Sequence, residues 1–297
     1  MRGKTHLWTL VAAVAIFVAT PAAADVFFFS TGNPDGLMGT LSQPASSGKL
    51  ETETADDFVL TQTTSISQAT ITGLLPSGSL PTSIISNVEV EVYHVFPTDS
   101  NVARTSGPPT FSTTQVPTRV NSPADVEIAS ATRDGSAGTL GFSAAILNPN
   151  FTVANTVVNG IHPSPNQLTH GEGPATGEEV FIIINFNTPI VLPADHYFFR
   201  PEVELTNGDF LWLSAPRPIV SPGTPFPPGS TDLQSWIRNA DLKPDWLRIG
   251  TDITGQGPFN AAFSLTGTLV PEPSTLLLLG SGLVGLGGIA WRHNRKR

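Results

Sequence analysis

Four carboxylates near the start of the body of the chain form its densest charge cluster: Glu51, Glu53, Asp56 and Asp57. Calcium takes six to eight oxygen ligands, and clustered carboxylates helped by backbone carbonyls commonly supply them. The cluster therefore predicts a candidate calcium site. Its spacing matches neither an EF-hand loop nor a nonapeptide repeat, so the alternative is solubilising charge in a loop before a strand at Phe58.

The tryptophans of the body, Trp212, Trp236 and Trp246, are a second group that could bind a ligand. An exposed indole face stacks on a sugar ring, which would suit a module for neutral glycans. The sequence predicts Trp212 in the core. Trp236 lies among polar neighbours in a predicted short helix over residues 232–239 and is the candidate glycan-binding residue. Apolar residues three and four positions away favour the alternative, that this turn docks its ring on the core.

The sequence shows no motif for a known type of hydrolysis. Its body histidines, His94, His162, His170 and His196, have no spacing typical of a zinc site, and the chain has no Cys and no G-x-S-x-G elbow. A glycosidase needs only two carboxylates across a groove, for which the candidates are Glu178, Glu179, Glu202 and Glu204. The last two alternate with Val203 and Leu205, as on a solvated sheet face. We therefore expect no cofactor except calcium, and no catalytic residue.

The elements that position these residues are predicted to be strands. Gly and Pro each number 27 and charged residues make up 13%, which is typical of a turn-rich β protein. Residues 88–96 alternate with a period of two, and residues 181–187 are apolar as in a central strand. Further strands are expected at 25–30, 57–61, 66–75, 139–146, 196–205, 210–214 and 261–269. The prediction is an all-β, antiparallel β-sandwich of jelly-roll type, formed by one domain over residues 25–270.

The charge of this body limits its partners. Residues 25–270 contain 9 Lys and Arg against 23 Asp and Glu, a net charge of about −14. Such a surface repels nucleic acid and anionic polymers, so nucleic acid is not an expected partner. Without Cys, the body has no disulfide, and packing or ions must stabilise it.

The start of the chain has the pattern of a secretory signal. Arg2 and Lys4 precede an apolar run over residues 7–19, and small residues follow. Ala22 and Ala24 occupy the −3 and −1 positions of a cleavage site before Asp25. Residues 1–24 are therefore predicted to be a signal helix that is removed on export.

The end of the chain has the pattern of a membrane anchor. The uncharged run at residues 275–291 would reach about 25 Å as a helix, enough to span a bilayer core. The basic tail, residues 292–297, contains four cations, Arg292, Arg295, Lys296 and Arg297. By the positive-inside rule they keep the C-terminus cytoplasmic, so the body lies outside.

The segment before this helix reads Val270, Pro271, Glu272 and Pro273. With the helix and the basic tail, it resembles the PEP-CTERM sorting signal of Gram-negative bacteria, here over residues 271–297. The resemblance implies recognition by the membrane protease exosortase, after delivery by the export machinery. It also implies a link to exopolysaccharide production.

The body resembles a group of exported bacterial β-sandwich domains without an assigned activity. The resemblance rests on Thr-Ala-Asp-Asp-Phe at residues 54–58 and Phe-Asn-Ala-Ala-Phe-Ser-Leu-Thr-Gly at residues 259–267. It implies the sandwich fold and no catalytic residues.

The expected function is that of an exported, non-catalytic surface or extracellular-matrix protein in the cell envelope, with an anchor that is transient or permanent. The first alternative is a glycan- or calcium-binding module, and the second is a polysaccharide hydrolase.

Overall fold

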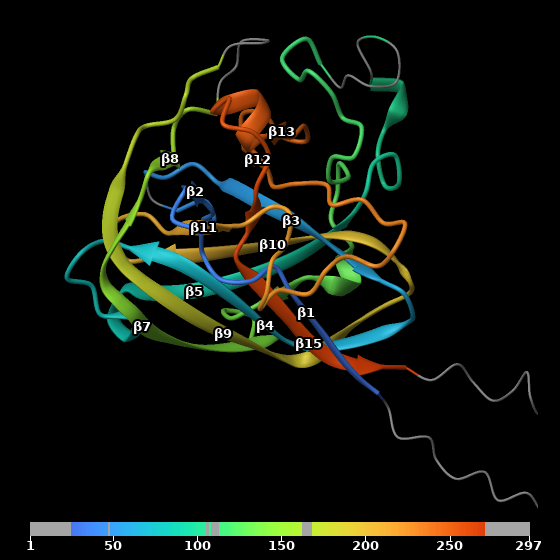
Figure 1. Cartoon of the computed structure of the whole chain (residues 1–297). Coiled ribbons are helices and arrows are strands. Elements are labelled where there is room, and N and C mark those ends of the chain that lie inside the picture. The colour runs from blue at the N-terminus through green and yellow to red at the C-terminus, as the bar shows by residue number, and fades with distance from the viewer. Residues whose placement is uncertain (1–24, 47, 105–106, 108–112, 162–167, 271–297) are drawn as a thin grey trace, which may run out of the picture.

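The computed structural model describes residues 25–46, 48–104, 107, 113–161 and 168–270 (Figure 1). The predicted signal helix, anchor helix and basic tail lie outside these residues. Within them, no helix is both long and apolar enough to cross a bilayer.

The first sheet is built around a long central strand, β4 (Thr64–Leu75). Strand β9 pairs along one edge of β4, while β15 and then β11 share the other edge. All pairs are antiparallel except that of β2 with β8. The other described strands of this sheet are β1 (Val26–Ser30), β2 (Met38–Leu41), β7 (Leu140–Val153), β8 (Asn155–Val157), β9 (Ala175–Leu192), β11 (Leu211–Ala215), β14 (Asn260–Ala261) and β15 (Phe263–Leu269).

The second sheet is wholly antiparallel and is ordered β13-β12-β3-β10-β5-β6. Its strands are β3 (Thr52–Leu60), β5 (Ile85–His94), β6 (Arg133–Asp134), β10 (Asp195–Leu205), β12 (Trp236–Asn239) and β13 (Leu247–Arg248). The helical turns of the described residues are short: α1 (Pro81–Ile84), η1 (Val102–Arg104), η2 (Ala129–Ala131) and η3 (Ile249–Ile253).

The main core lies between the two sheets and is rich in aromatic rings. The ring of Phe199 on β10 stacks on Phe263 of β15, with centroids 5.2 Å apart. Trp212 on β11 meets both rings edge-on, and its indole nitrogen donates to the carbonyl of Ala262. Burying apolar area of this kind on both sheets is the main term that stabilises a β-sandwich.

The close approach of β4 to the residue before β11, its neighbour in the first sheet, also requires a glycine. A Cβ on Gly73 of β4 would lie 2.1 Å from the ring of Phe210, so only glycine fits there. Phe210 is completely buried as a result.

The all-β, antiparallel fold and the main strand positions are confirmed, whereas the jelly-roll connectivity stays a prediction. The predicted helix over residues 232–239 is wrong. Residues 236–239 form β12, because their backbone pairs with both β3 and β13. Short strands such as β2, β8 and β13 were not predicted.

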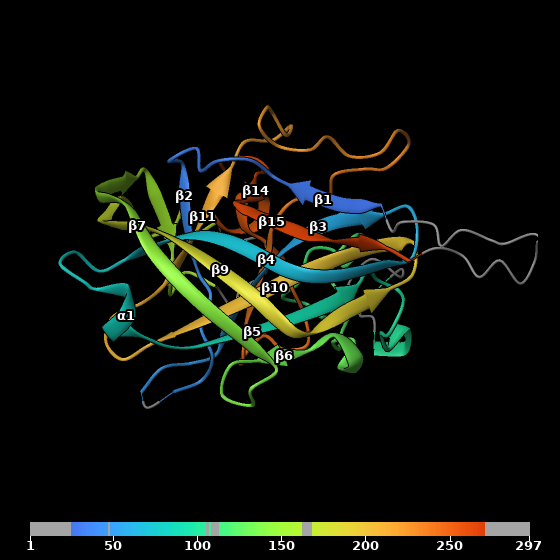
Figure 2. The same cartoon turned by 90° about the horizontal axis from the view of Figure 1, so that it is seen from below.

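The two ends of the described body lie together. Val26 pairs with Thr268, and the amide of Leu269 donates to the carbonyl of Asp25. The start of β1 and the end of β15 meet at the lower right of Figure 1, whereas β12 and β13 lie at the top. Figure 2, the view from below, shows β1 and β15 side by side.

We expect Phe199→Ala to lower the free energy of unfolding by about 3–5 kcal/mol, because it opens a cavity between the two sheets. Phe28→Ala is the matched control, since Phe28 is 53% exposed on β1. It should change stability by about 0.5 kcal/mol or less. Urea unfolding followed by tryptophan fluorescence measures both, and equal effects would contradict the assignment of the core.

Candidate functional site

Strand β3 carries three of the four carboxylates of the predicted calcium site, and the alternation of the strand separates them. Asp56 points to the same face as the core residue Phe58, whereas Glu53 and Asp57 point to the opposite face. Glu51 precedes the strand. The described residues contain no group of three acidic, histidine or cysteine side chains that could hold a metal ion. The four carboxylates therefore do not form one ligand set.

Protein donors occupy the two aspartates. Asp56 accepts from the Ser235 hydroxyl at 3.1 Å and from the Ala261 amide at 2.8 Å. Asp57 contacts Nε2 of His196 at 2.6 Å and accepts from the Leu233 amide at 3.1 Å. Burial raises the pKa of both carboxyls well above the ordinary value, and it lowers the pKa of His196 to about 4. These groups join β3 to the segment before β12.

The outer face of the second sheet carries an unpredicted cluster around Arg200, whose side chain is 1% exposed. Its guanidinium lies 2.8 Å from Glu91 on β5, 2.8 Å from Glu202 on β10 and 3.5 Å from Glu53 on β3. Arg238 on β12 donates to the same Glu53 oxygen at 2.7 Å. One cation thus joins three neighbouring strands, and a second extends the network to a fourth.

The carboxyls of this cluster differ in pKa. Burial raises the pKa of Glu202 to about 8 and that of Glu89 to about 7, despite the opposing charge of Arg200. Burial also acts on Glu53, but Arg200 and Arg238 outweigh it and hold the Glu53 pKa below the ordinary value. Carboxyls with separated pKa values are typical of acid–base catalysis. Here Glu53 and Glu202 are each 1% exposed, and the Arg200 guanidinium contacts both. Both carboxyls are therefore held by Arg200 and shielded from solvent.

The expectation that Glu202 lies on a solvated sheet face is wrong, because Glu202 is buried. The trace of this cluster in the sequence is alternating charge, with Glu89 and Glu91 on one strand and Arg200 and Glu202 on another. In the fold Arg200 lies opposite Glu91, whereas Glu202 lies opposite Glu89, a pair of like groups.

Trp236 does not present the exposed ring that a glycan platform requires, because it is 1% exposed. It packs in a second apolar cluster with Trp246, Tyr93 and Phe198 on the outer face of the second sheet. The Arg238 guanidinium lies 4.2 Å from the centre of the Trp246 ring. The alternative prediction, that the Trp236 ring is part of a core, is confirmed, although in a strand and not in a helix.

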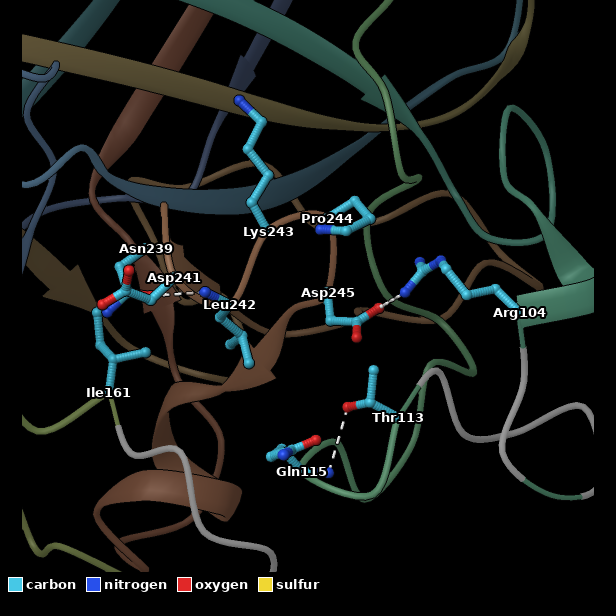
Figure 3. Close-up of a pocket in the computed structure, with 10 residues that line it drawn as sticks. All are labelled: Arg104, Thr113, Gln115, Ile161, Asn239, Asp241, Leu242, Lys243, Pro244 and Asp245. Atoms are coloured by element: carbon cyan, nitrogen blue, oxygen red, sulfur yellow. Dashed lines mark hydrogen bonds and ion pairs between the residues drawn. The ribbon is translucent and has the colours of Figure 1, made fainter.

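A cavity of about 330 Å³ lies at the edge of this aromatic cover (Figure 3). Its walls include Lys243, Pro244 and Asp245 on one segment and Arg104 on another, and Arg104 is paired with Asp245 at 2.6 Å. Thr113 and Gln115 line the lower part of the cavity in Figure 3.

A second depression, of about 500 Å³, adjoins the first at three shared residues, Ile161, Asn239 and Asp241. Lys49 and Asp209, 3.3 Å apart, line its far part. We call the two depressions together the distal groove. Asn239 pairs with Thr52, eight residues from the end of β3 at Leu60. The groove therefore lies roughly 26 Å along β3 from the Leu60 end of that strand, which is the end near β15.

Residues 269–296 match the PEP-CTERM protein-sorting motif. The predicted signal is thus confirmed, and the match includes Val270, Pro271, Glu272, Pro273, Arg292, Arg295 and Lys296. The motif begins at Leu269, the last residue of the last described strand, and it supports an exported, envelope-associated protein sorted through exosortase. No curated protein and no solved structure matches the chain. The predicted cleavage residues Ala22 and Ala24 and the tail residue Arg297 lie outside the described residues.

We expect millimolar calcium to leave the melting temperature of the chain unchanged, because protein donors already occupy Glu53, Asp56 and Asp57. A site present only in the folded state would raise that temperature by mass action. The measurement is a thermal melt in calcium against a melt in chelator. A rise that Asp56→Asn abolishes would restore the calcium site.

We expect the substitution Glu202→Gln to stabilise the fold increasingly as the pH rises from 5 to 8. The unfolded side chain loses its proton near pH 4.5, whereas the folded one keeps it to about pH 8. Over this range each pH unit lowers the free energy of unfolding of the wild type by about 1 kcal/mol through this group. The amide that replaces the carboxyl in the variant has no such proton to lose.

Urea unfolding at several pH values measures the difference between the variant and the wild type. Glu204→Gln, on the same strand and half-buried, is the control for the loss of one carboxyl. A Glu202→Gln difference that does not change between pH 5 and 8 would show that Glu202 ionises normally in the fold.

Proposed function

We propose that this chain is a non-catalytic surface or extracellular-matrix protein that exosortase sorts and cleaves after export. The observation that carries the proposal is the junction between fold and motif. Leu269 is the last residue of β15 and the first of the matched motif. Cleavage after Pro273 would leave every described strand intact.

The state of the buried acids supports a structural role. Glu202 and Asp57, two carboxyls whose pKa values burial raises, lie inside networks that tie strands together. A catalytic acid must reach its substrate, and these two side chains are each only 1% exposed. A protein of this kind works through its surface and its position in the envelope.

The paired ends of the body support delivery by one face. β1 follows the predicted signal cleavage site, and β15 leads into the sorting motif, yet the two strands are neighbours. Both predicted membrane segments would therefore leave the same pole of the domain. Removal of the first would free Asp25 beside β15, and removal of the second would release the body.

We expect the mature protein in its native host to begin near Asp25 and to end near Pro273. Mass spectrometry of the intact protein and of its terminal peptides measures both ends. A variant with Ala in place of Pro271, Glu272 and Pro273 is the control, and it should keep residues 275–297. Recovery of residues 275–297 on the mature wild-type protein would exclude cleavage by exosortase.

A further inference from the structure

We propose that the distal groove binds a neutral oligosaccharide of several units. This inference rests on the proposed role outside the cell, and it names a ligand class and a site. The two adjoining depressions have the sizes of ligand sites, and they share three lining residues. A chain of several small units can place units in both depressions at once.

The charge of the groove selects an uncharged ligand. Its described lining contains three cations, Lys49, Arg104 and Lys243, and three carboxylates, Asp209, Asp241 and Asp245. The groove is therefore balanced, although the body as a whole has a net charge of about −14. An anionic polymer would meet repulsion from the surrounding surface and no net attraction at the groove.

The three cations are also already in use. Lys49 is paired with Asp209, and Arg104 is paired with Asp245. Lys243 lies 3.4 Å from Glu53, a carboxylate of the cluster around Arg200. An anionic ligand would have to break these pairs, whereas a hydroxyl can hydrogen-bond to them as they stand.

Some side chains that line the distal groove have hydrogen-bonding groups without a protein partner among the described residues. Asp241 is exposed and makes no hydrogen bond or ion pair with a described residue. The side-chain amide of Asn159 is likewise without a described partner, and among the described residues the Gln115 side chain bonds only through its oxygen. Planar amides and carboxylates can bond two neighbouring hydroxyls at once.

The test is isothermal titration calorimetry on the full chain in a detergent without sugar groups. The probes are cellohexaose, mannohexaose and xylohexaose, with hexagalacturonate as the acidic counterpart. We expect at least one neutral hexasaccharide to bind, with an affinity that does not depend on salt. Binding of hexagalacturonate alone, or of none of the four, would overturn the proposal.

The double variant Asp241→Ala, Asn159→Ala should weaken binding at least about tenfold, because it removes two hydrogen-bonding side chains. Both residues are exposed, so the melting temperature should be preserved. Phe28→Ala is the matched control, because Phe28 lines a separate depression on the first sheet. Loss of binding in Phe28→Ala, with binding kept in the double variant, would move the site there and overturn the assignment. Terminal processing is measured independently, so failure here would leave the sorting proposal standing.

Discussion

The buried guanidinium of Arg200 is the constraint on which the second sheet depends. A charge removed from water is very costly unless it is paired, and here carboxylates from β3, β5 and β10 surround it. Removing Glu53, whose pKa Arg200 and Arg238 hold below the ordinary value, would leave part of that charge uncompensated. The strand register is thereby specified from the outer face as well as by the apolar core, because a slip of one residue would turn Arg200 inward.

The cover over that outer face follows from the same constraint. A sheet face with a buried cation must be shielded from water, and the aromatic cluster of Trp236, Trp246 and Tyr93 does this. Arg238 belongs to both groups, since it bonds Glu53 and lies over the Trp246 ring. The part of the second sheet around Arg200 and Arg238 is therefore buried on both faces.

Sequence patterns predicted the strands in which the alternation of apolar and polar residues continues over many positions. In β5, Val88, Val90 and Val92 alternate with polar residues over enough positions to identify a strand and its inner face. β12 has only four residues, and the spacing around Trp236 imitates a helix, so pairing with β3 decided its conformation. The sorting motif was predictable because it is linear. The Arg200 cluster was not, because alternating charge looks the same on a solvated face and on a covered one.

The distal groove and the sorting motif lie at opposite ends of strand β3. The motif leaves from the end of β15, next to Thr63 at the turn between β3 and β4. The groove begins at the other end of β3, where Asn239 pairs with Thr52. Strand β3 is held rigidly between these points by Asp56, Asp57 and Glu53, all of which bond to other segments. A body tethered through β15 would therefore turn its groove away from the membrane, toward the space where extracellular polymers lie.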